Sequence, residues 1–329
     1  MNNFKKNIAL FFIATVVVLS GACTHTPDVV SFKHMALYPE GVDWDADRKR
    51  FLVTSIRKGI VGTVTDDGAY SVFAQDPRMV SAVGIRIDAG RDRVLVCNAD
   101  PGASKFSSPK TTGKLAALAV FQLSTGKLIE YVNLAEGLEG SHFCNDIVID
   151  KDGTAYITDS FSTIIYKVTP EYKVSVLIDN KRFSGKAFNL NGIVIKDNYL
   201  LVDKFNEGIL FKIPLDKPET FTQVKINEKF DGADGLLWAP DGSLVLIAND
   251  SGHGGFVPGV TTNKTIKLTS TDNWASAKVV QTVDTGDVFA TTGVVRDGEI
   301  YVTYSMIHVL FNPKTKKHVE QFEIRRQKF

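Results

Sequence analysis

The chain has 329 residues, of which 44% are hydrophobic and 23% are charged, and its formal net charge is +1. This balance, without any long basic run, excludes an electrostatic nucleic-acid footprint. Three cysteines are too few for a disulfide scaffold, and their spacing does not match a zinc site. We therefore expect a globular protein that binds a small-molecule substrate or ligand and no nucleic acid; its oligomeric state is left open.

The first 22 residues have the features of an export signal. Lys5 and Lys6 form a basic start, the apolar run 8–19 is too short to span a bilayer comfortably, and small residues fill positions 20–22. We interpret residues 1–22 as a signal peptide of the lipoprotein type. No second apolar stretch in the sequence is long enough to cross a membrane.

Cys23 stands where a bacterial lipoprotein is acylated. The stretch LSGAC resembles a lipobox, although Leu19 lies one place further from the cysteine than is usual. We predict lipidation at Cys23 and a tether over residues 23–35, with the membrane reached only through the lipid. Because Thr24 is not the aspartate that retains lipoproteins at the inner membrane, we expect an outer-membrane protein facing the periplasm. The alternative is a secreted protein that is cut nearby, with Cys23 incidental.

Six similar segments recur along the chain. Each is a short strand pattern, a turn rich in Asp and Gly, and a second strand pattern, and two further strands follow each pair. Four strands per repeat, at a period of roughly 40 to 60 residues, are typical of propeller blades. We predict an all-β fold over residues 36–329: a six-bladed β-propeller of four-stranded antiparallel blades around a central channel. The segments open at Glu40, Val83, Asn145, Asn191, Asp234 and Thr292.

The sequence leaves two features of the ring undecided. Either residues 29–37 or the C-terminal stretch HVEQFEI could supply the last strand of the final blade. Cys97 ends a strand of the second repeat and Cys144 starts one of the third, so both face the same end of the ring. This topology permits a disulfide without requiring one, so the sequence leaves the pairing open while favouring free thiols.

The residue that opens each repeat carries the functional signal. The first strand of every blade lines the channel, so these positions form one ring, and Glu40, Asn145, Asn191 and Asp234 bring oxygen atoms to it. Two carboxylates and two amides form a hard, oxygen-only ligand set, which suits calcium best. No histidine or cysteine occupies the ring, which argues against a dedicated zinc site. We predict one divalent cation, calcium first, with zinc, magnesium or manganese as alternatives.

Ordinary turns are the competing explanation, because Asn-Gly and Asp-Gly pairs commonly form them. However, the expected hairpin turns, such as Asp152-Gly153, follow the first strand of a repeat, whereas the candidate ligands precede it. Glutamate, the residue at position 40, is not a turn former. The combined pattern therefore favours a metal site.

These segments resemble a known family. EGVDWD, NDIVIDKDG, LNGIVI and ADGLLWAPDG look like the repeat motifs of the gluconolactonase/regucalcin (senescence marker protein) family, and more distantly of diisopropylfluorophosphatase and paraoxonase. The resemblance implies a six-bladed propeller and calcium- or zinc-dependent hydrolysis of lactones or related esters. It implies the same four metal ligands, with Asp234 as general base or nucleophile. Phe143 stands where sugar-lactone hydrolases tend to carry arginine, so we expect a more apolar substrate.

Two long insertions, residues 99–113 and 250–263, follow second strands and should overhang the mouth of the channel. His142 lies on this side and is a second catalytic candidate as a proton shuttle, although a packing role is the more common one for such a histidine. Other residues near this end could line a substrate pocket or merely cap loops: Phe143, Asn98, Asp159, Asp203, Asn249 and His253.

The leading hypothesis is a metal-dependent hydrolase of a lactone or related ester, in which the cation polarises the carbonyl group. The alternative is a non-catalytic propeller that calcium braces and that binds a small ligand or a protein on its top face. Fold alone does not decide between them.

Overall fold

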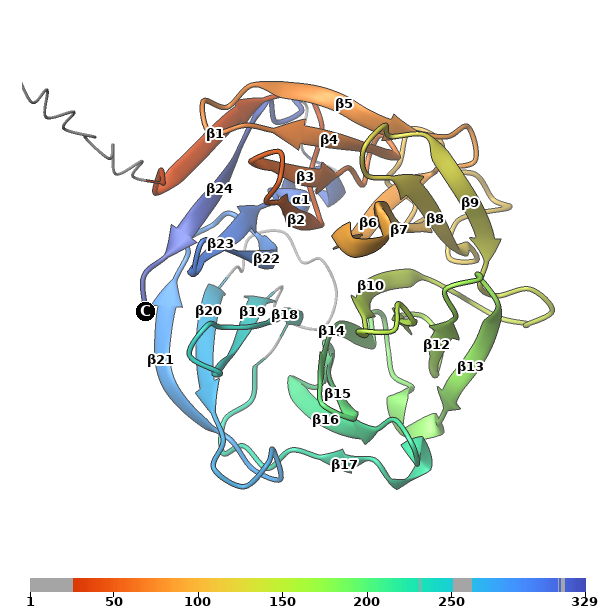
Figure 1. The fold of residues 1–329 in the computed structure, drawn as a ribbon, viewed down its shortest axis with the longest axis vertical. Coiled ribbons are helices and arrows are strands. Elements are labelled where there is room, and N and C mark those ends of the chain that lie inside the picture. The colour runs from red at the N-terminus through yellow and green to blue at the C-terminus, as the bar shows by residue number, and fades with distance from the viewer. Residues whose placement is uncertain (1–25, 231, 251–261, 313, 315–316) are drawn as a thin grey trace, which may run out of the picture.

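Runs of β-branched and aromatic residues, separated by turns, form six four-stranded antiparallel sheets arranged around one axis (Figure 1). The predicted six-bladed β-propeller is therefore confirmed. The computed structural model describes residues 26–230, 232–250, 262–312, 314 and 317–329. In each blade the innermost strand borders the channel and the other three strands lie further out.

The first five blades follow the order of the sequence from the channel outwards. Blade 1 contains β2 (Val42–Asp45), β3 (Arg50–Thr54), β4 (Ile60–Val64) and β5 (Tyr70–Gln75). Blade 2 contains β6 (Ser81–Asp88), β7 (Arg93–Ala99), β8 (Ala116–Gln122) and β9 (Leu128–Asn133). Blade 3 contains β10 (Cys144–Ile149), β11 (Ala155–Asp159), β12 (Ile164–Val168) and β13 (Val174–Asp179). Blade 4 contains β14 (Leu190–Lys196), β15 (Tyr199–Lys204), β16 (Ile209–Pro214) and β17 (Thr222–Gln223). Blade 5 contains β18 (Ala233–Trp238), β19 (Leu244–Asp250), β20 (Thr262–Thr269) and β21 (Lys278–Asp284).

Both ends of the chain build the sixth blade, which contains β22 (Ala290–Arg296), β23 (Glu299–Tyr304), β24 (Gln321–Gln327) and, outermost, β1 (Val29–Lys33). Phe32 pairs with Phe322, and both side chains are buried. The two segments considered as alternatives for closing the ring are thus both used. The propeller begins before residue 36, and the predicted tether is too long because its second half contains β1.

Second strands such as β7, β11 and β15 are buried along their whole length, whereas outermost strands such as β9 and β13 are largely exposed. This difference arises because neighbouring blades cover both faces of the inner strands. The predicted hairpin turns are present, and Gly153, Gly242 and Gly298 have φ angles of 88°, 81° and 82°. Such positive φ angles are easily adopted only by glycine.

A disulfide joins blades 2 and 3. Cys97, in β7, is bonded to Cys144, the first residue of β10, and their Cα atoms lie 5.3 Å apart. The expectation of free thiols was therefore wrong. The first strand of blade 3 packs directly against blade 2, which brings the two cysteines face to face.

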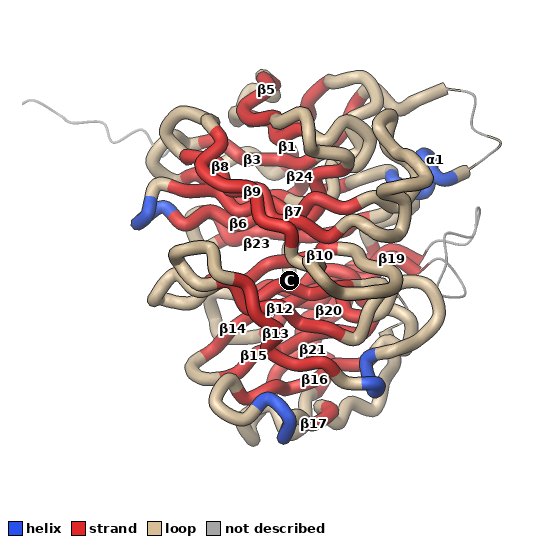
Figure 2. The backbone as a smooth tube through the Cα atoms, turned by 90° about the vertical axis from the view of Figure 1, so that its right-hand side faces the viewer, coloured by secondary structure: helices blue, strands red, loops and turns tan. Residues whose placement is uncertain are grey.

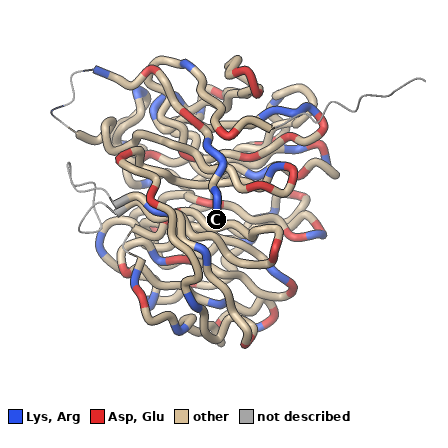
Figure 3. The backbone as a smooth tube through the Cα atoms, turned by 90° about the vertical axis from the view of Figure 1, so that its left-hand side faces the viewer, with Lys and Arg blue, Asp and Glu red and all other residues tan. Residues whose placement is uncertain are grey.

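The helical content of the described residues is small. It consists of α1 (Ile307–Phe311) and three short 3-10 helices at Ala89–Arg91, Lys181–Phe183 and Pro218–Thr220. Within the described ranges no helix has both the length and the apolar character needed to cross a membrane. In Figure 2, α1 lies at the right-hand side of the ring, which is the mouth side. Basic and acidic residues are interspersed over the side shown in Figure 3, in keeping with the small net charge.

Candidate metal-binding pocket

Irregularities in the first strands aim the ring residues into the channel. In β10, Cys144 pairs with Asp159 and Ile147 with Ile157, so Asn145 and Asp146 together face a single residue of β11. The strands β6, β14, β18 and β22 have irregularities at the equivalent place. A β-bulge of this kind bends the strand and turns a side chain away from the regular alternation.

The register of blade 6 corrects one position of the ring. In β22, Ala290 pairs with Tyr304 and Gly293 with Val302, which makes Thr291 the equivalent of Asn145. Thr291 lines the pocket, and its hydroxyl donates a hydrogen bond of 2.7 Å to the backbone carbonyl of Glu40. Thr292, which the sequence analysis placed in the ring, lies one residue deeper in the channel.

The glycines that follow the ring residues are required by close contacts between blades. A β-carbon on Gly84 would lie 2.2 Å from the Asn145 carbonyl oxygen, and one on Gly235 would lie 2.4 Å from the Thr291 carbonyl oxygen. Neither glycine has a positive φ angle, unlike the hairpin glycines. Asn191-Gly192 lies inside β14 and Asp234-Gly235 lies inside β18, so neither is a turn pair.

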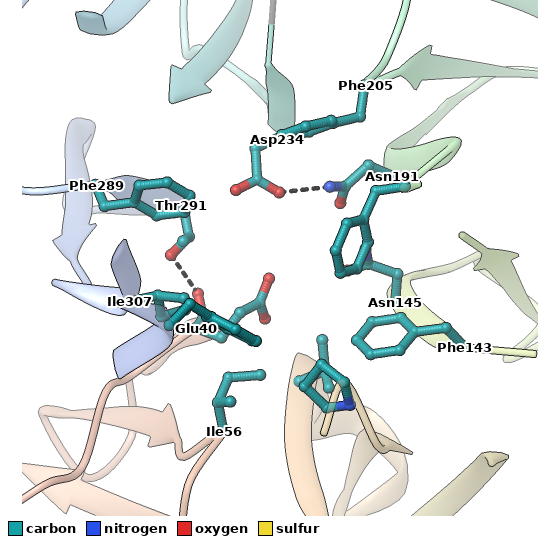
Figure 4. Close-up of a pocket in the computed structure, with 14 residues that line it drawn as sticks. Glu40, Ile56, Phe143, Asn145, Asn191, Phe205, Asp234, Phe289, Thr291 and Ile307 are labelled. Carbon is teal, nitrogen blue, oxygen red and sulfur yellow. Dashed lines mark hydrogen bonds between the residues drawn. The ribbon is translucent and has the colours of Figure 1, made fainter. Parts of the chain in front are cut away.

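The four predicted ligands converge at the floor of one pocket, and we call this set the oxygen ring: Glu40, Asn145, Asn191 and Asp234 (Figure 4). The amide of Asn191 donates a hydrogen bond of 2.6 Å to Asp234. The amide of Asn249 donates to the other oxygen of the same carboxylate.

Ser160 orients a further member of the oxygen ring. Its hydroxyl oxygen accepts a hydrogen bond of 2.7 Å from the side-chain amide of Asn145. Ser160 was missed, although a signal was available, because the first, third and sixth repeats all end on a serine, at Ser55, Ser160 and Ser305. Asn249 was predicted to line the substrate pocket, whereas the structure shows Asn249 supporting Asp234.

The oxygen ring lacks positive charge. Glu40 Oε2 and Asn145 Oδ1 are buried without a hydrogen-bond partner. Burial raises the pKa of Asp234 to about 7. Burial, together with the negative charges of Asp234 and Asp146, raises the pKa of Glu40 well above its usual value. These features fit a bound cation. It would coordinate the buried oxygens that have no hydrogen-bond partner, and it would neutralise the closely spaced carboxylates.

The ligand set is a mixed one. Within the described ranges, no three His, Cys, Asp or Glu residues group in a way that could hold a metal. The oxygen ring instead combines two carboxylates with two amides. This composition suits a hard cation such as calcium, which accepts neutral amide oxygens alongside carboxylates.

Below the oxygen ring, the channel contains further buried carboxylates. Asp146 lies 3.5 Å from the guanidinium group of Arg86. Asp203 accepts a hydrogen bond of 3.0 Å from the backbone of Gly192, while its second oxygen is buried without a partner. Burial, with the charges of Asp234 and Asp146, raises the pKa of Asp203 well above its usual value. Asp203 thus lies behind the ring and not among the residues that line the pocket.

Above the oxygen ring, the walls of the pocket are apolar, and the cavity measures about 440 Å³ including the solvent at its mouth. We call five phenylalanines of its wall the aromatic collar: Phe143, Phe188, Phe205, Phe289 and Phe311. Phe143 and Phe188 meet edge to face with ring centroids 5.3 Å apart. Phe143 was predicted to line the pocket, whereas the other four were missed. A signal was available, because Phe143, Phe188 and Phe289 each come two or three residues before a ring position.

The second catalytic candidate, His142, does not line the pocket. It is buried, and its Nδ1 lies 2.7 Å from Asp159, which also accepts a hydrogen bond from Tyr166. The hydrogen bond to Asp159 raises the pKa of His142. Asp159 also accepts backbone hydrogen bonds from Phe143 and Phe161, so this cluster anchors the segment that carries Phe143 of the aromatic collar.

Another predicted pocket residue lies elsewhere, and one is outside the described residues. Asn98 is buried between loops, where its side chain bonds the backbone of Val80 and Arg78 and the hydroxyl of Tyr131. His253 lies outside the described residues, as does most of the second insertion. The first insertion does overhang the mouth, because Pro101 lines the pocket.

A β-propeller with an oxygen-lined channel mouth agrees with the sequence comparison. The model of the SMP-30/gluconolactonase/LRE-like region matches residues 38–256, and the chain belongs to this family. No curated protein matches the chain significantly.

Among solved structures, the allergen Mala s 1 of Malassezia sympodialis matches with a TM-score of 0.69 and 16% identity, over 91% of this chain and 96% of the other. A luciferin-regenerating enzyme matches with a TM-score of 0.61 and 12% identity, over 92% and 97%. The calcium-binding protein regucalcin of Agrobacterium tumefaciens matches with a TM-score of 0.58 and 17% identity, over 89% and 92%. At these identities, the similarity shows the fold.

Proposed function

We propose that this protein is a divalent-cation-dependent hydrolase of a lactone or related ester whose substituent is apolar. The observation that carries the proposal is the oxygen ring at the floor of the pocket, with Glu40 Oε2 and Asn145 Oδ1 buried and unpartnered. Membership of the SMP-30/gluconolactonase/LRE-like family supports a lactonase-like activity. The description of regucalcin as calcium-binding supports calcium as the cation.

Glu40, Asn145, Asn191 and Asp234 would hold the cation. A divalent cation supplies a Lewis acid that polarises a carbonyl group and offsets the charge that develops on its oxygen. Asp234 accepts a proton from the attacking water or attacks the carbonyl carbon itself, and the amides of Asn191 and Asn249 fix the direction of its carboxylate.

The aromatic collar binds the apolar part of the substrate and excludes water from the ester. Besides the residues of the oxygen ring, Thr291 is the one polar side chain in the described lining, and its hydroxyl is already bonded to the Glu40 carbonyl. Such a wall offers little to the hydroxyl groups of a sugar lactone. This agrees with phenylalanine, and not arginine, at position 143.

One observation favours the alternative, a calcium-braced binding protein. His142 is held by Asp159 away from the pocket, so the described lining contains no histidine to transfer protons. In that case the cation would brace four blades, and the collar would hold a ligand that is not hydrolysed.

A panel of alkyl lactones, aryl esters and gluconolactone, assayed with calcium and then with chelator, tests the proposal. We expect the apolar lactones to be hydrolysed only with the cation.

Asp234→Asn keeps an oxygen for the cation but loses the proton acceptor, so activity should fall far more than calcium affinity, whereas Asp234→Ala should reduce both. Asp152→Asn, at an exposed hairpin turn, is the matched control. Full activity of Asp234→Asn would show that Asp234 is not the base. Calcium binding without hydrolysis of any compound would favour the binding protein.

For the export signal, which lies outside the described residues, we propose that Cys23 is lipidated and tethers the propeller to the outer membrane on its periplasmic side. The sequence of residues 5–23 supports this proposal.

A further inference from the structure

Three cationic residues lie on segments at the mouth end of the channel, close in sequence to residues that line the pocket. Arg57 and Lys58 lie in the turn after β3, and Lys105 lies in the insertion after β7. Both segments follow second strands, which end on the same face of the ring as the oxygen ring. The two segments also line the pocket, because Ile56 and Pro101 belong to its wall.

Hydrogen bonds join the two segments that carry Arg57 and Lys105. The backbone N–H of Lys105 donates to the Arg57 carbonyl oxygen at 3.0 Å, and the Arg57 guanidinium donates to the Ala103 carbonyl oxygen at 3.2 Å. The ammonium group of Lys58 lies 3.1 Å from Nδ1 of His34. The turn of blade 1 and the insertion of blade 2 thus form one fixed rim, which we call the cationic rim: Arg57, Lys58 and Lys105.

The cationic rim has no carboxylate partner in the part of the chain that the structure describes. Within the described residues, no Asp or Glu oxygen lies within 4.0 Å of any of its three cationic groups. By contrast, Arg182 on the same face is paired with Glu207 at 2.9 Å. Burial, followed by the charges of Lys105 and Arg57, lowers the pKa of Lys58. The charges of Lys105 and Arg57 thus disfavour the charged form of Lys58, and a bound anion would offset this effect.

We propose that the cationic rim binds the anionic group, a carboxylate or a phosphate, of a small amphiphilic molecule whose apolar part occupies the aromatic collar. If the protein is the hydrolase proposed above, the bound molecule is its substrate, and this part of the inference rests on the proposed function. The substrate class is then a lactone or ester with an apolar body and a terminal anion. Arg57 supplies planar paired donors, and Lys58 and Lys105 supply further charge.

Calorimetric binding of octanoate and of octyl phosphate, with octan-1-ol as the neutral match, tests the inference without any hydrolysis. Each titration is done with calcium and with chelator, because a carboxylate bound by the oxygen ring would need the cation and one bound by the rim would not. The variants are Arg57→Gln/Lys58→Gln and, as a milder change at an exposed site, Lys105→Gln. Lys181→Gln removes the same charge from an exposed position elsewhere on the mouth face and is the control.

We expect at least one of the two anions to bind roughly tenfold more tightly than octan-1-ol, with or without calcium. This preference should disappear in the double variant, fall in Lys105→Gln and persist in Lys181→Gln. The comparison of the two anions identifies the preferred head group. Equal binding of the alcohol and both anions would overturn the inference, as would an anion preference that needs calcium or that survives in the double variant. Because no step depends on catalysis, an inactive lactone panel leaves this result unaffected.

Discussion

Replacing Gly84 by alanine tests whether close contact between blades positions the oxygen ring. Gly84 follows the ring residue Val83, and its φ angle is not positive, so alanine tolerates the backbone conformation. Its β-carbon, however, would lie 2.2 Å from the carbonyl oxygen of Asn145 and 2.9 Å from Cα of Asp146. Both contacts are with the backbone of the next blade, which has no side-chain rotation with which to make room.

The size of the effect follows from these distances. Ordinary contact begins at 3.4 Å, so blades 2 and 3 must separate by about 1.2 Å at this level. Overpacking of this kind costs about 1–3 kcal/mol and more where the surroundings are rigid. We therefore expect a loss of about 3 kcal/mol in the free energy of unfolding. The control is Gly90→Ala, whose β-carbon would meet nothing within 4 Å, and whose effect should stay within about 0.5 kcal/mol.

Urea unfolding, followed by tryptophan fluorescence, measures the midpoint and slope for both variants, first with calcium and then with chelator. Because Asn145 belongs to the oxygen ring, its displacement in Gly84→Ala should also weaken calcium binding, which titration calorimetry measures. If Gly84→Ala unfolds at the same urea concentration as Gly90→Ala and binds calcium like the parent, close backbone contact does not position the ring.

Three other predictions concern stability and location. Removal of the Cys97–Cys144 disulfide, which closes a loop across 47 residues, should lower the unfolding free energy by about 4 kcal/mol; urea unfolding of the double serine variant would show this, and an unchanged midpoint would contradict it. Asp159 raises the pKa of His142, so this pair stabilises the folded state at a pH below the unfolded pKa, and that contribution is lost as pH rises through the folded pKa. The fall in urea midpoint between about pH 6 and about pH 8 should therefore shrink in His142→Asn; an unaltered pH profile would contradict the assignment. Cys23→Ser should release the protein from the membrane fraction, and a parent protein that is already soluble would rule out the anchor.

The fold and the members of the oxygen ring could be predicted because a propeller repeats one local pattern. Each first strand begins at the channel mouth, so a residue's place in its repeat gives its height in the channel without knowledge of any contact. Glu40, Asn145, Asn191 and Asp234 could be identified in this way. In blade 6 the predicted position was wrong by one residue, because two threonines precede the glycine and only the pairing of β22 with β23 selects Thr291.

The remaining features depend on how neighbouring blades and their loops pack, which the repeat pattern does not contain. His142 and Phe143 are adjacent in sequence, yet only Phe143 lines the pocket. The His142 side chain instead forms a hydrogen bond with Asp159 outside the pocket. The disulfide and the cationic rim each join segments of two blades, and the rim brings Arg57 to the carbonyl of Ala103, 46 residues away. The sequence by itself thus determined which oxygens meet at the channel. The tertiary structure alone decided what surrounds them, because side-chain direction at the mouth is set by contacts between blades.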